Sequence, residues 1–194
     1  MSEGRIQNVH QQDYGGKHFR STLEAQTAQT LDEMGIPFAY EERKIELFKG
    51  FRTPFQKDKV RAINYMPDFE IGPIMLECKG FETPEWKLKK KLLFKYLMEN
   101  EPETIFYQIH DAKKSLLQVL DKHLTTLGLA VQVTPKPKKK AESSSPAIYD
   151  SISEAMEDLG LQGKNLGPIL NSLTGHKEFV YNYNWKLIQL NQFI

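Results

Sequence analysis

Hydrophobic positions recur along the chain with two different periods, and Gly and Pro separate the segments that carry them. Apolar residues spaced as on one helical face predict helices over residues 19–34, 84–100 and 112–127, the last of them stopped by Gly128. Short aromatic or β-branched runs predict strands over residues 38–40, 44–48, 103–110 and 129–133. This alternation of helices and strands is typical of an α/β protein.

Two further strand-like runs, VRAINYMPDFEI and IMLECK, are separated by Gly-Pro at 72–73, which is typical of a hairpin. If the turn is centred on these two residues, Asp68 lies opposite Glu77, whereas a longer turn shifts this register. Glu77 and Lys79 are two positions apart, so they project from one face of a strand while Cys78 projects from the other. The hairpin is therefore expected to bring two carboxylates and an ammonium group together.

Two carboxylates beside a lysine suit phosphodiester hydrolysis. Mg²⁺ prefers oxygen ligands, and a bound metal polarises a phosphate and lowers the pKa of its water. A nearby lysine stabilises the charge that develops in the transition state. The alternative is an exposed strand of alternating charges in which Pro-Asp is only a turn, and the spacing by itself leaves both interpretations open.

The segment MPDF followed by LECKG resembles the PD-(D/E)xK motif of restriction-endonuclease-like nucleases. FRSTLEAQ, GIPFAYE and the lysine-rich segment after LECKGF extend this resemblance, over residues 18–110, to phage junction-resolving endonucleases. The resemblance implies a restriction-endonuclease-like α/β core with a mixed central sheet flanked by helices. It also implies catalysis by Asp68, Glu77 and Lys79 with Mg²⁺, for which Mn²⁺ is expected to substitute.

In those relatives a glutamate on the first helix joins the metal site, and Glu24 in FRSTLEAQ is the matching position. The backbone carbonyl of Cys78 is a further expected metal ligand. Ser21 and Glu24 also have the spacing of a capping box, in which the glutamate bonds a backbone amide at the start of a helix. Both roles of Glu24 remain open at this stage.

The predicted helix after Lys79 carries lysines beside its apolar stripe, so a cationic face is expected near the scissile phosphate. The expected contacts from this helix are Lys87, Lys90 and Lys91, and a merely solvated face is the alternative. Arg52, Lys57, Lys59 and Arg61 in the preceding loop are weaker candidates. Trp86 is expected to be a packing residue rather than a base-stacking one.

Residues 134–147, TPKPKKKAESSSPA, are rich in Pro, Lys and Ser and predict a linker. After it, a capping box at Ser151 and Glu154 predicts a short helix that ends at Gly160, and a second helix is expected over residues 165–173. Two short helices joined by a glycine-containing turn suggest a helix-turn-helix.

SISEAMEDLG, NLGPILNSLTGHKEF and YNWKLI resemble the nuclease-associated modular DNA-binding domain of phage and homing endonucleases. Asn165 and Lys186 are its expected DNA contacts, and Asn182 stands where that family more often has glycine. The predicted organisation is thus a flexible arm over 1–18, a nuclease domain over 19–133, a linker over 134–147 and a mainly helical module over 148–194.

Composition excludes several classes of protein. No stretch of the 194 residues approaches the length of a membrane span, and the first residues lack the apolar run of a secretory signal, so a cytoplasmic protein is expected. A single cysteine and five scattered histidines argue against disulfides and a zinc site. The net charge of +1 reveals no global basic field.

The expected function is metal-dependent endonucleolytic cleavage of DNA, with a homodimer as the simplest way to cut both strands. The resemblance to junction resolvases favours branched DNA, whereas the C-terminal module favours a sequence-selected duplex, and the sequence does not decide between them. The alternative function is a DNA-binding or DNA-bridging protein with an inactive nuclease-like core.

Overall fold

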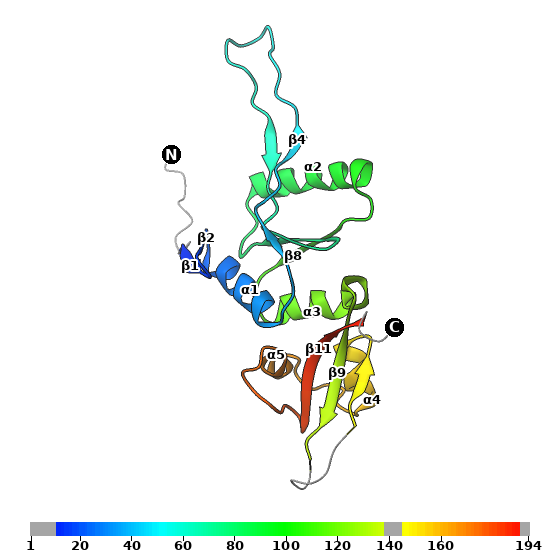
Figure 1. Ribbon diagram of the computed structural model, residues 1–194. Helices are drawn as coiled ribbons and strands as arrows, with labels where there is room; N and C mark the ends of the chain where they lie inside the picture. Colours follow the sequence, from blue (N-terminus) through cyan, green and yellow to red (C-terminus); the bar gives the residue numbers. More distant parts are fainter. Residues whose placement is uncertain (1–10, 138–144, 191–194) are drawn as a thin grey trace. The chain divides into compact units, whose positions relative to one another are not determined.

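The computed structural model describes residues 11–137 and 145–190 (Figure 1). It divides the chain into two compact units. The middle unit is Pro37–His110, and the terminal unit comprises the described parts of Met1–Ile36 and Asp111–Ile194.

The middle unit contains a four-stranded sheet with strand order β3-β6-β7-β8. Its strands are β3 (Ala39–Tyr40), β6 (Phe69–Ile71), β7 (Ile74–Cys78) and β8 (Ile105–Ile109). β6 is antiparallel to both of its neighbours, whereas β7 and β8 are parallel. The prediction of a mixed sheet in an α/β fold is therefore confirmed at this level.

Helix α2 (Pro84–Asn100) makes the crossover from β7 to β8 that a parallel strand pair requires. Thr83 caps it by accepting the N–H of Trp86, and Pro84 occupies its first turn, at the start of the predicted helix. Its buried face packs Leu93 and Leu97 onto a cluster with Ile45, Tyr65, Met75 and Trp86. Leu88 does not belong to this face, because its side chain is exposed, whereas that of Trp86 is buried.

The hairpin between β6 and β7 has the predicted register. Phe69 lies opposite Leu76 and Ile71 opposite Ile74, so the turn is centred on Gly72 and Pro73. Gly72 has a φ of 54°, a left-handed conformation that glycine adopts without strain. Asp68 directly precedes β6. Continuing the observed register by one residue places its position opposite Glu77.

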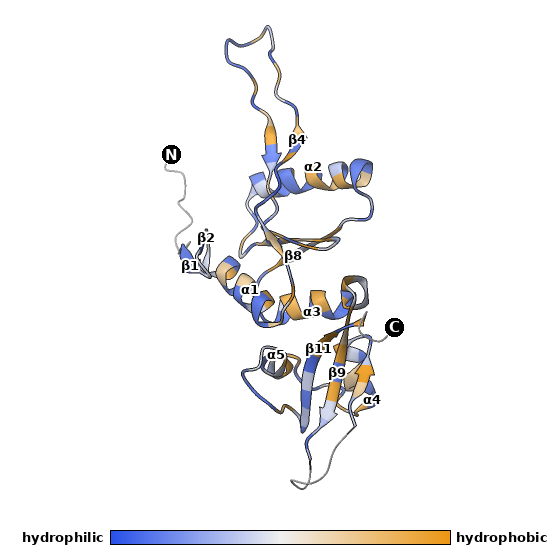
Figure 2. Ribbon diagram, in the orientation of Figure 1, coloured by the Kyte–Doolittle hydropathy of each residue, from blue (hydrophilic) through white to orange (hydrophobic). Residues whose placement is uncertain are grey.

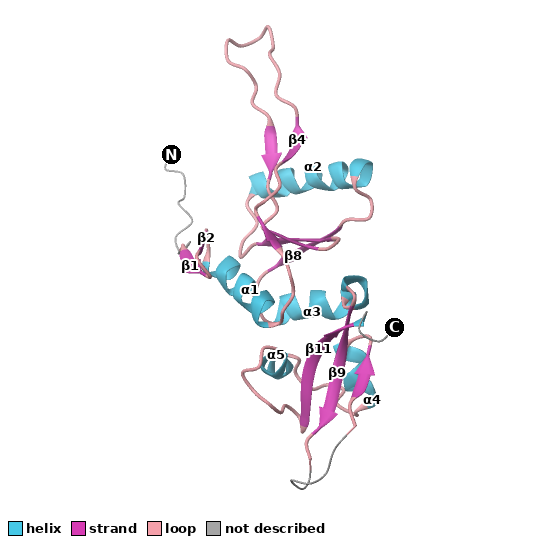
Figure 3. Cartoon of the chain, viewed as in Figure 1, coloured by secondary structure: helices cyan, strands magenta, loops and turns pink. Residues whose placement is uncertain are grey.

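A second antiparallel pair, β4 (Ile45–Phe48) and β5 (Ile63–Tyr65), continues into a long ribbon. A further bridge joins Phe51 to Val60 beyond the two strands. Figures 1 and 3 show this ribbon extending past α2 as a narrow loop. We call residues 48–61 the arm.

The terminal unit begins with a small hairpin, β1 (Gln12–Tyr14) and β2 (Lys17–Phe19), followed by α1 (Thr22–Glu33). The hairpin lies within residues 1–18, which were predicted to be a flexible N-terminal segment, and residues 1–10 lie outside the described ranges. Helix α1 ends at Glu33, next to the predicted end at residue 34, and the predicted capping box places its N-cap at Ser21.

The remainder of the terminal unit is a three-stranded antiparallel sheet with three α-helices and a 3₁₀ turn. The strand order is β10-β9-β11. The elements are α3 (Lys114–His123), η1 (Thr125–Leu127), β9 (Leu129–Pro135), β10 (Ala147–Tyr149), α4 (Ile152–Asp158), α5 (Gly167–Leu173) and β11 (Tyr183–Gln189). Figure 2 shows hydrophobic residues along β9, and the indole of Trp185 on β11 is fully buried.

Strand β9 pairs with β10 and β11 rather than with the sheet of the middle unit. The strand predicted to close the nuclease domain therefore shares a sheet with the C-terminal residues, and the predicted boundaries do not coincide with the two units. The segment predicted to be mainly helical also supplies two strands, β10 and β11. Their pairing with β9 could not be predicted, because a strand pattern does not specify its partner. Of the predicted linker, residues 138–144 lie outside the described ranges.

Within the described ranges, no helix is long and apolar enough to cross a membrane.

Candidate active site

Asp68 and Glu77 are the two buried carboxylates of the middle unit's hairpin. Their exposed fractions are 8% and 6%. The backbone N–H of Cys78 donates to Asp68 Oδ2 at 2.7 Å, which holds this carboxylate against the end of β7. A buried carboxylate that is bonded to a fixed backbone amide has a defined position, which a catalytic or metal-binding group requires.

Glu77 has two polar partners in the middle unit. The hydroxyl of Tyr65 donates to Glu77 Oε2 at 2.9 Å, and Lys79 Nζ lies 3.6 Å from Glu77 Oε1. Tyr65 is the last residue of β5. Glu77 lies on β7, and Lys79 directly follows that strand. The carboxylate is therefore held between two elements that are separate in sequence.

Lys79 lies directly after β7, where the backbone pairing with β8 continues. Its N–H donates to the carbonyl of Ile109 at 2.9 Å, and its ammonium group lies 5.2 Å from the centre of the Trp86 ring. A cation over an indole face is attracted by the ring's quadrupole. The side chain is one-third exposed, so its charge can reach a ligand at the surface while the stem stays ordered.

Burial raises the pKa of Glu77, because the charged carboxylate loses hydration. The Tyr65 hydroxyl and the ammonium groups of Lys79 and Lys89 act in the opposite direction on this pKa, since each favours the charged form. Burial and the neighbouring carboxylate raise the pKa of Tyr65 itself, so the phenol stays a hydrogen-bond donor across the accessible pH range.

The donor chemistry of this pair fits Mg²⁺. Asp68 and Glu77 supply carboxylate oxygens, and Mg²⁺ commonly uses one or two carboxylates and completes its octahedron with water and substrate phosphate. The described part of the chain holds no group of three or more His, Cys, Asp and Glu side chains arranged around a metal position. The expected role of the Cys78 carbonyl as a metal ligand stays a prediction.

Glu24 lies in the first turn of α1, in the terminal unit. Ser21 Oγ accepts the N–H of Glu24 at 3.2 Å, while the Glu24 carboxylate accepts the Ser21 hydroxyl at 2.8 Å and the N–H of Arg20 at 3.1 Å. These bonds are those of a reciprocal helix cap, which was the competing interpretation. The predicted metal-binding role of Glu24 stays a prediction, whereas Asp68, Glu77, Cys78 and Lys79 lie together in the middle unit.

The predicted DNA contacts on α2 differ in their surroundings. Lys87 and Lys91 are exposed, whereas Lys90 forms an ion pair with Glu82 and lies 3.5 Å from Gln108 Oε1. Lys90 therefore organises the end of the sheet as well as carrying charge.

In the terminal unit, Asn165 Oδ1 accepts the N–H of Gly167 at 2.9 Å, next to the start of α5. Lys186 is exposed on β11, which follows the two predicted short helices. Contact of either residue with DNA stays a prediction.

Sequence reasoning missed Tyr65 as part of the site and left Trp86 outside it. Tyr65 stands three residues before Asp68, in NYMPDF, but no periodicity indicates that its hydroxyl reaches Glu77. Trp86 is buried, as predicted for a packing residue, yet its face also holds the Lys79 ammonium group. Its indole N–H donates to Gln108 Oε1 at 3.0 Å, which fixes the ring.

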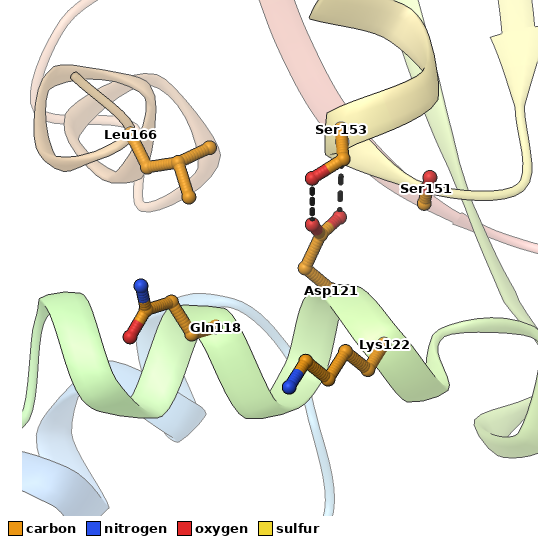
Figure 4. A pocket seen from close by; sticks show the side chains of 6 residues that line it. All are labelled: Gln118, Asp121, Lys122, Ser151, Ser153 and Leu166. Atoms are coloured by element: carbon orange, nitrogen blue, oxygen red, sulfur yellow. Dashed lines mark hydrogen bonds between the residues drawn. The ribbon is translucent and has the colours of Figure 1, made fainter. Parts of the chain in front are cut away.

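A pocket of about 550 Å³ with polar side chains in its walls lies in the terminal unit (Figure 4). Asp121 accepts the N–H groups of Ile152 and Ser153 at 2.6 and 3.2 Å and also bonds the Ser153 hydroxyl. Because these bonds cap the start of α4 from α3, the Asp121 carboxylate has a structural role. The pocket is lined by Gln118, Asp121, Lys122, Ser151, Ser153 and Leu166.

Comparison of the chain with protein-family models, curated proteins and solved structures gives no match.

Proposed function

We propose that the protein is a magnesium-dependent endonuclease that hydrolyses phosphodiester bonds in DNA. The observation that carries this proposal is the pairing of two buried carboxylates, Asp68 and Glu77, with Lys79 on one hairpin. Burying two carboxylates near each other is costly unless a cation or hydrogen bonds compensate for the lost hydration. The resemblance of MPDF and LECKG to the PD-(D/E)xK motif assigns these three residues to phosphodiester hydrolysis.

In the proposed mechanism Asp68 and Glu77 would hold the metal, and the N–H of Cys78 and the hydroxyl of Tyr65 orient their carboxylates. When bound there, Mg²⁺ would supply the charge that polarises a phosphate and favours ionisation of water. The ammonium group of Lys79 orients the attacking oxygen and offsets the negative charge that gathers on the phosphorus oxygens. Trp86 keeps this ammonium group on the side of Glu77.

The finer points of the proposal follow from the resemblance. Branched DNA and a sequence-selected duplex are both kept as substrates, and a homodimer is proposed so that two strands can be cut. Lys87, Lys90, Lys91, Asn165 and Lys186 are the proposed DNA contacts.

The test is incubation of the purified protein with supercoiled plasmid and with a synthetic four-way junction in Mg²⁺. Strand breaks that disappear with a chelator and in Asp68→Asn would support the proposal, since asparagine can still accept the Cys78 N–H. Glu103→Gln is the matched control, because it removes an exposed carboxylate from the same unit. Binding of DNA without breaks in Mg²⁺ would instead favour an inactive DNA-bridging protein.

A further inference from the structure

The arm concentrates positive charge. Its formal charge is +4, from five cationic side chains and the carboxylate of Asp58, compared with +1 for the whole chain. All five cations are exposed. They are Lys49, Arg52, Lys57, Lys59 and Arg61.

The arm also exposes three phenylalanine rings. Phe48 and Phe51 are 41% and 46% exposed, and Phe55 at the tip is 93% exposed. The Phe55 N–H donates to Thr53 Oγ1 at 3.1 Å, which orders the turn that carries the ring. A large apolar ring displayed among cations indicates a partner that offers both negative charge and flat apolar surface.

The arm has a defined ribbon geometry through Val60. Phe51 and Val60 exchange two backbone hydrogen bonds of 3.0 and 2.8 Å. At Gly50 the strands are so close that a Cβ atom would lie 2.8 Å from the Val60 carbonyl oxygen and 2.9 Å from the Ala62 nitrogen. The rings of Phe48 and Phe51 pack edge to face, 5.9 Å apart.

The arm is joined directly to the carboxylate pair. Its returning strand runs into β5, whose last residue, Tyr65, donates a hydrogen bond to Glu77. The ten residue-to-residue steps from Phe55 to Tyr65 span at most roughly 33 Å when extended, which is close to one turn of B-DNA. When a duplex is bound at the Asp68–Glu77 carboxylate pair, this length lets the arm lie along about one helical turn of it.

We propose that the arm binds the duplex beside the cut, with its cations on phosphates and Phe55 stacked against bases. A two-stranded ribbon fits the major groove, cations neutralise phosphates, and aromatic or apolar side chains stack on or wedge between bases. The inference deepens the proposed endonuclease function and rests on it for the choice of DNA as the partner.

The test measures the affinity of the full chain for a fluorescent duplex, in chelator so that no cleavage occurs, over a series of salt concentrations. Lys57→Ala/Lys59→Ala is expected to weaken binding at least tenfold and to lower the salt slope by about 2, since each phosphate contact adds about 1. Phe55→Ala is expected to weaken binding about tenfold without changing that slope.

The matched controls are Lys113→Ala/Lys114→Ala, a pair of neighbouring exposed lysines on another element, and Met98→Ala, an apolar side chain that is 79% exposed on α2. Equal losses in arm and control variants, or no loss in the arm variants, would overturn the proposal. Sedimentation is recorded in parallel. Arm variants that dissociate an oligomer but bind DNA like the parent would assign the arm to a second copy of the chain, and would also overturn it.

Cleavage of plasmid is then measured separately in Mg²⁺. Reduced affinity of the arm variants with no cleavage by the parent protein would refute the endonuclease while the arm proposal stands. Normal affinity and cleavage in the arm variants, with a parent protein that cuts, would refute the arm proposal alone.

Discussion

The hydroxyl of Tyr65 donates a hydrogen bond of 2.9 Å to Glu77 Oε2. The two residues lie on different strands, β5 and β7, and Tyr65 is buried against the Trp86 ring at 5.9 Å between centroids. One carboxylate oxygen of Glu77 is therefore engaged with the phenol, and the other oxygen is 3.6 Å from Lys79. This arrangement makes Tyr65 a positioning residue for the proposed metal-binding carboxylate.

Tyr65→Phe tests that role. Loss of the bond removes a stabiliser of the charged form, so the pKa of Glu77 rises further and the acidic limb of the pH–rate profile moves to higher pH. We expect kcat to fall about tenfold near the acidic limb and less at high pH. Tyr96→Phe, which removes a hydroxyl bonded to Glu101, is the control and should leave the profile unchanged. A uniform loss of activity at all pH values would instead indicate a packing role.

Glu77→Gln is expected to abolish cleavage and yet stabilise the metal-free fold at neutral pH. Because burial raises the pKa of Glu77 above its value of 4.5 in an unfolded chain, stability decreases as pH rises from that value through the folded-state pKa. Urea unfolding at pH 7 and pH 4 in chelator measures this effect. The variant should gain more over the parent at pH 7 than at pH 4, and an equal difference at both would contradict the prediction.

Arg43 clamps two carboxylates of the middle unit. Its Nη2 and Nη1 atoms lie 2.7 Å from Glu70 Oε1 and 2.6 Å from Glu101 Oε1. Arg43→Met should cost about 1–2 kcal/mol of unfolding free energy at pH 7. Lys95→Met, which breaks an exposed pair with Glu99, should cost almost nothing.

The cost at Arg43 should also depend on pH. The hydrogen bond from Arg43 lowers the pKa of Glu101, so its contribution is complete above 4.5, the value of an unperturbed carboxyl, and is lost as pH falls through the lower folded-state value. Denaturant midpoints of parent and variant should therefore converge in acid, and parallel curves down to the lowest pH would refute the assignment.

Gly50→Ala tests the geometry of the arm. The new methyl group would meet the backbone of Val60 and Ala62, so the ribbon must open locally. We expect faster hydrogen exchange of the Phe51 and Val60 amides and weaker binding of duplex DNA. Gly80→Ala is the matched control for exchange, since its methyl group would meet no atom within 4 Å. Unchanged protection of both amides in Gly50→Ala would contradict the ribbon.

Several features of this protein are determined locally, and the sequence by itself predicts them. The Gly72–Pro73 turn sets the register of β6 and β7, so the approach of Asp68 to the end of β7 follows from a few neighbouring residues. The caps at Ser21, Thr83 and Ser151 are likewise local, because each involves an amide three residues away.

The tertiary structure decided what joins residues distant in sequence. Three contacts require the chain to fold back on itself. They are the hydrogen bond from Tyr65 to Glu77, the cation–π contact of Lys79 with Trp86, and the pairing of β9 with β11. Periodicity specifies which face of an element is apolar, but many partners can cover an apolar face equally well. The choice among them depends on side-chain packing and on chain connectivity over the whole unit, so only the folded structure could reveal it.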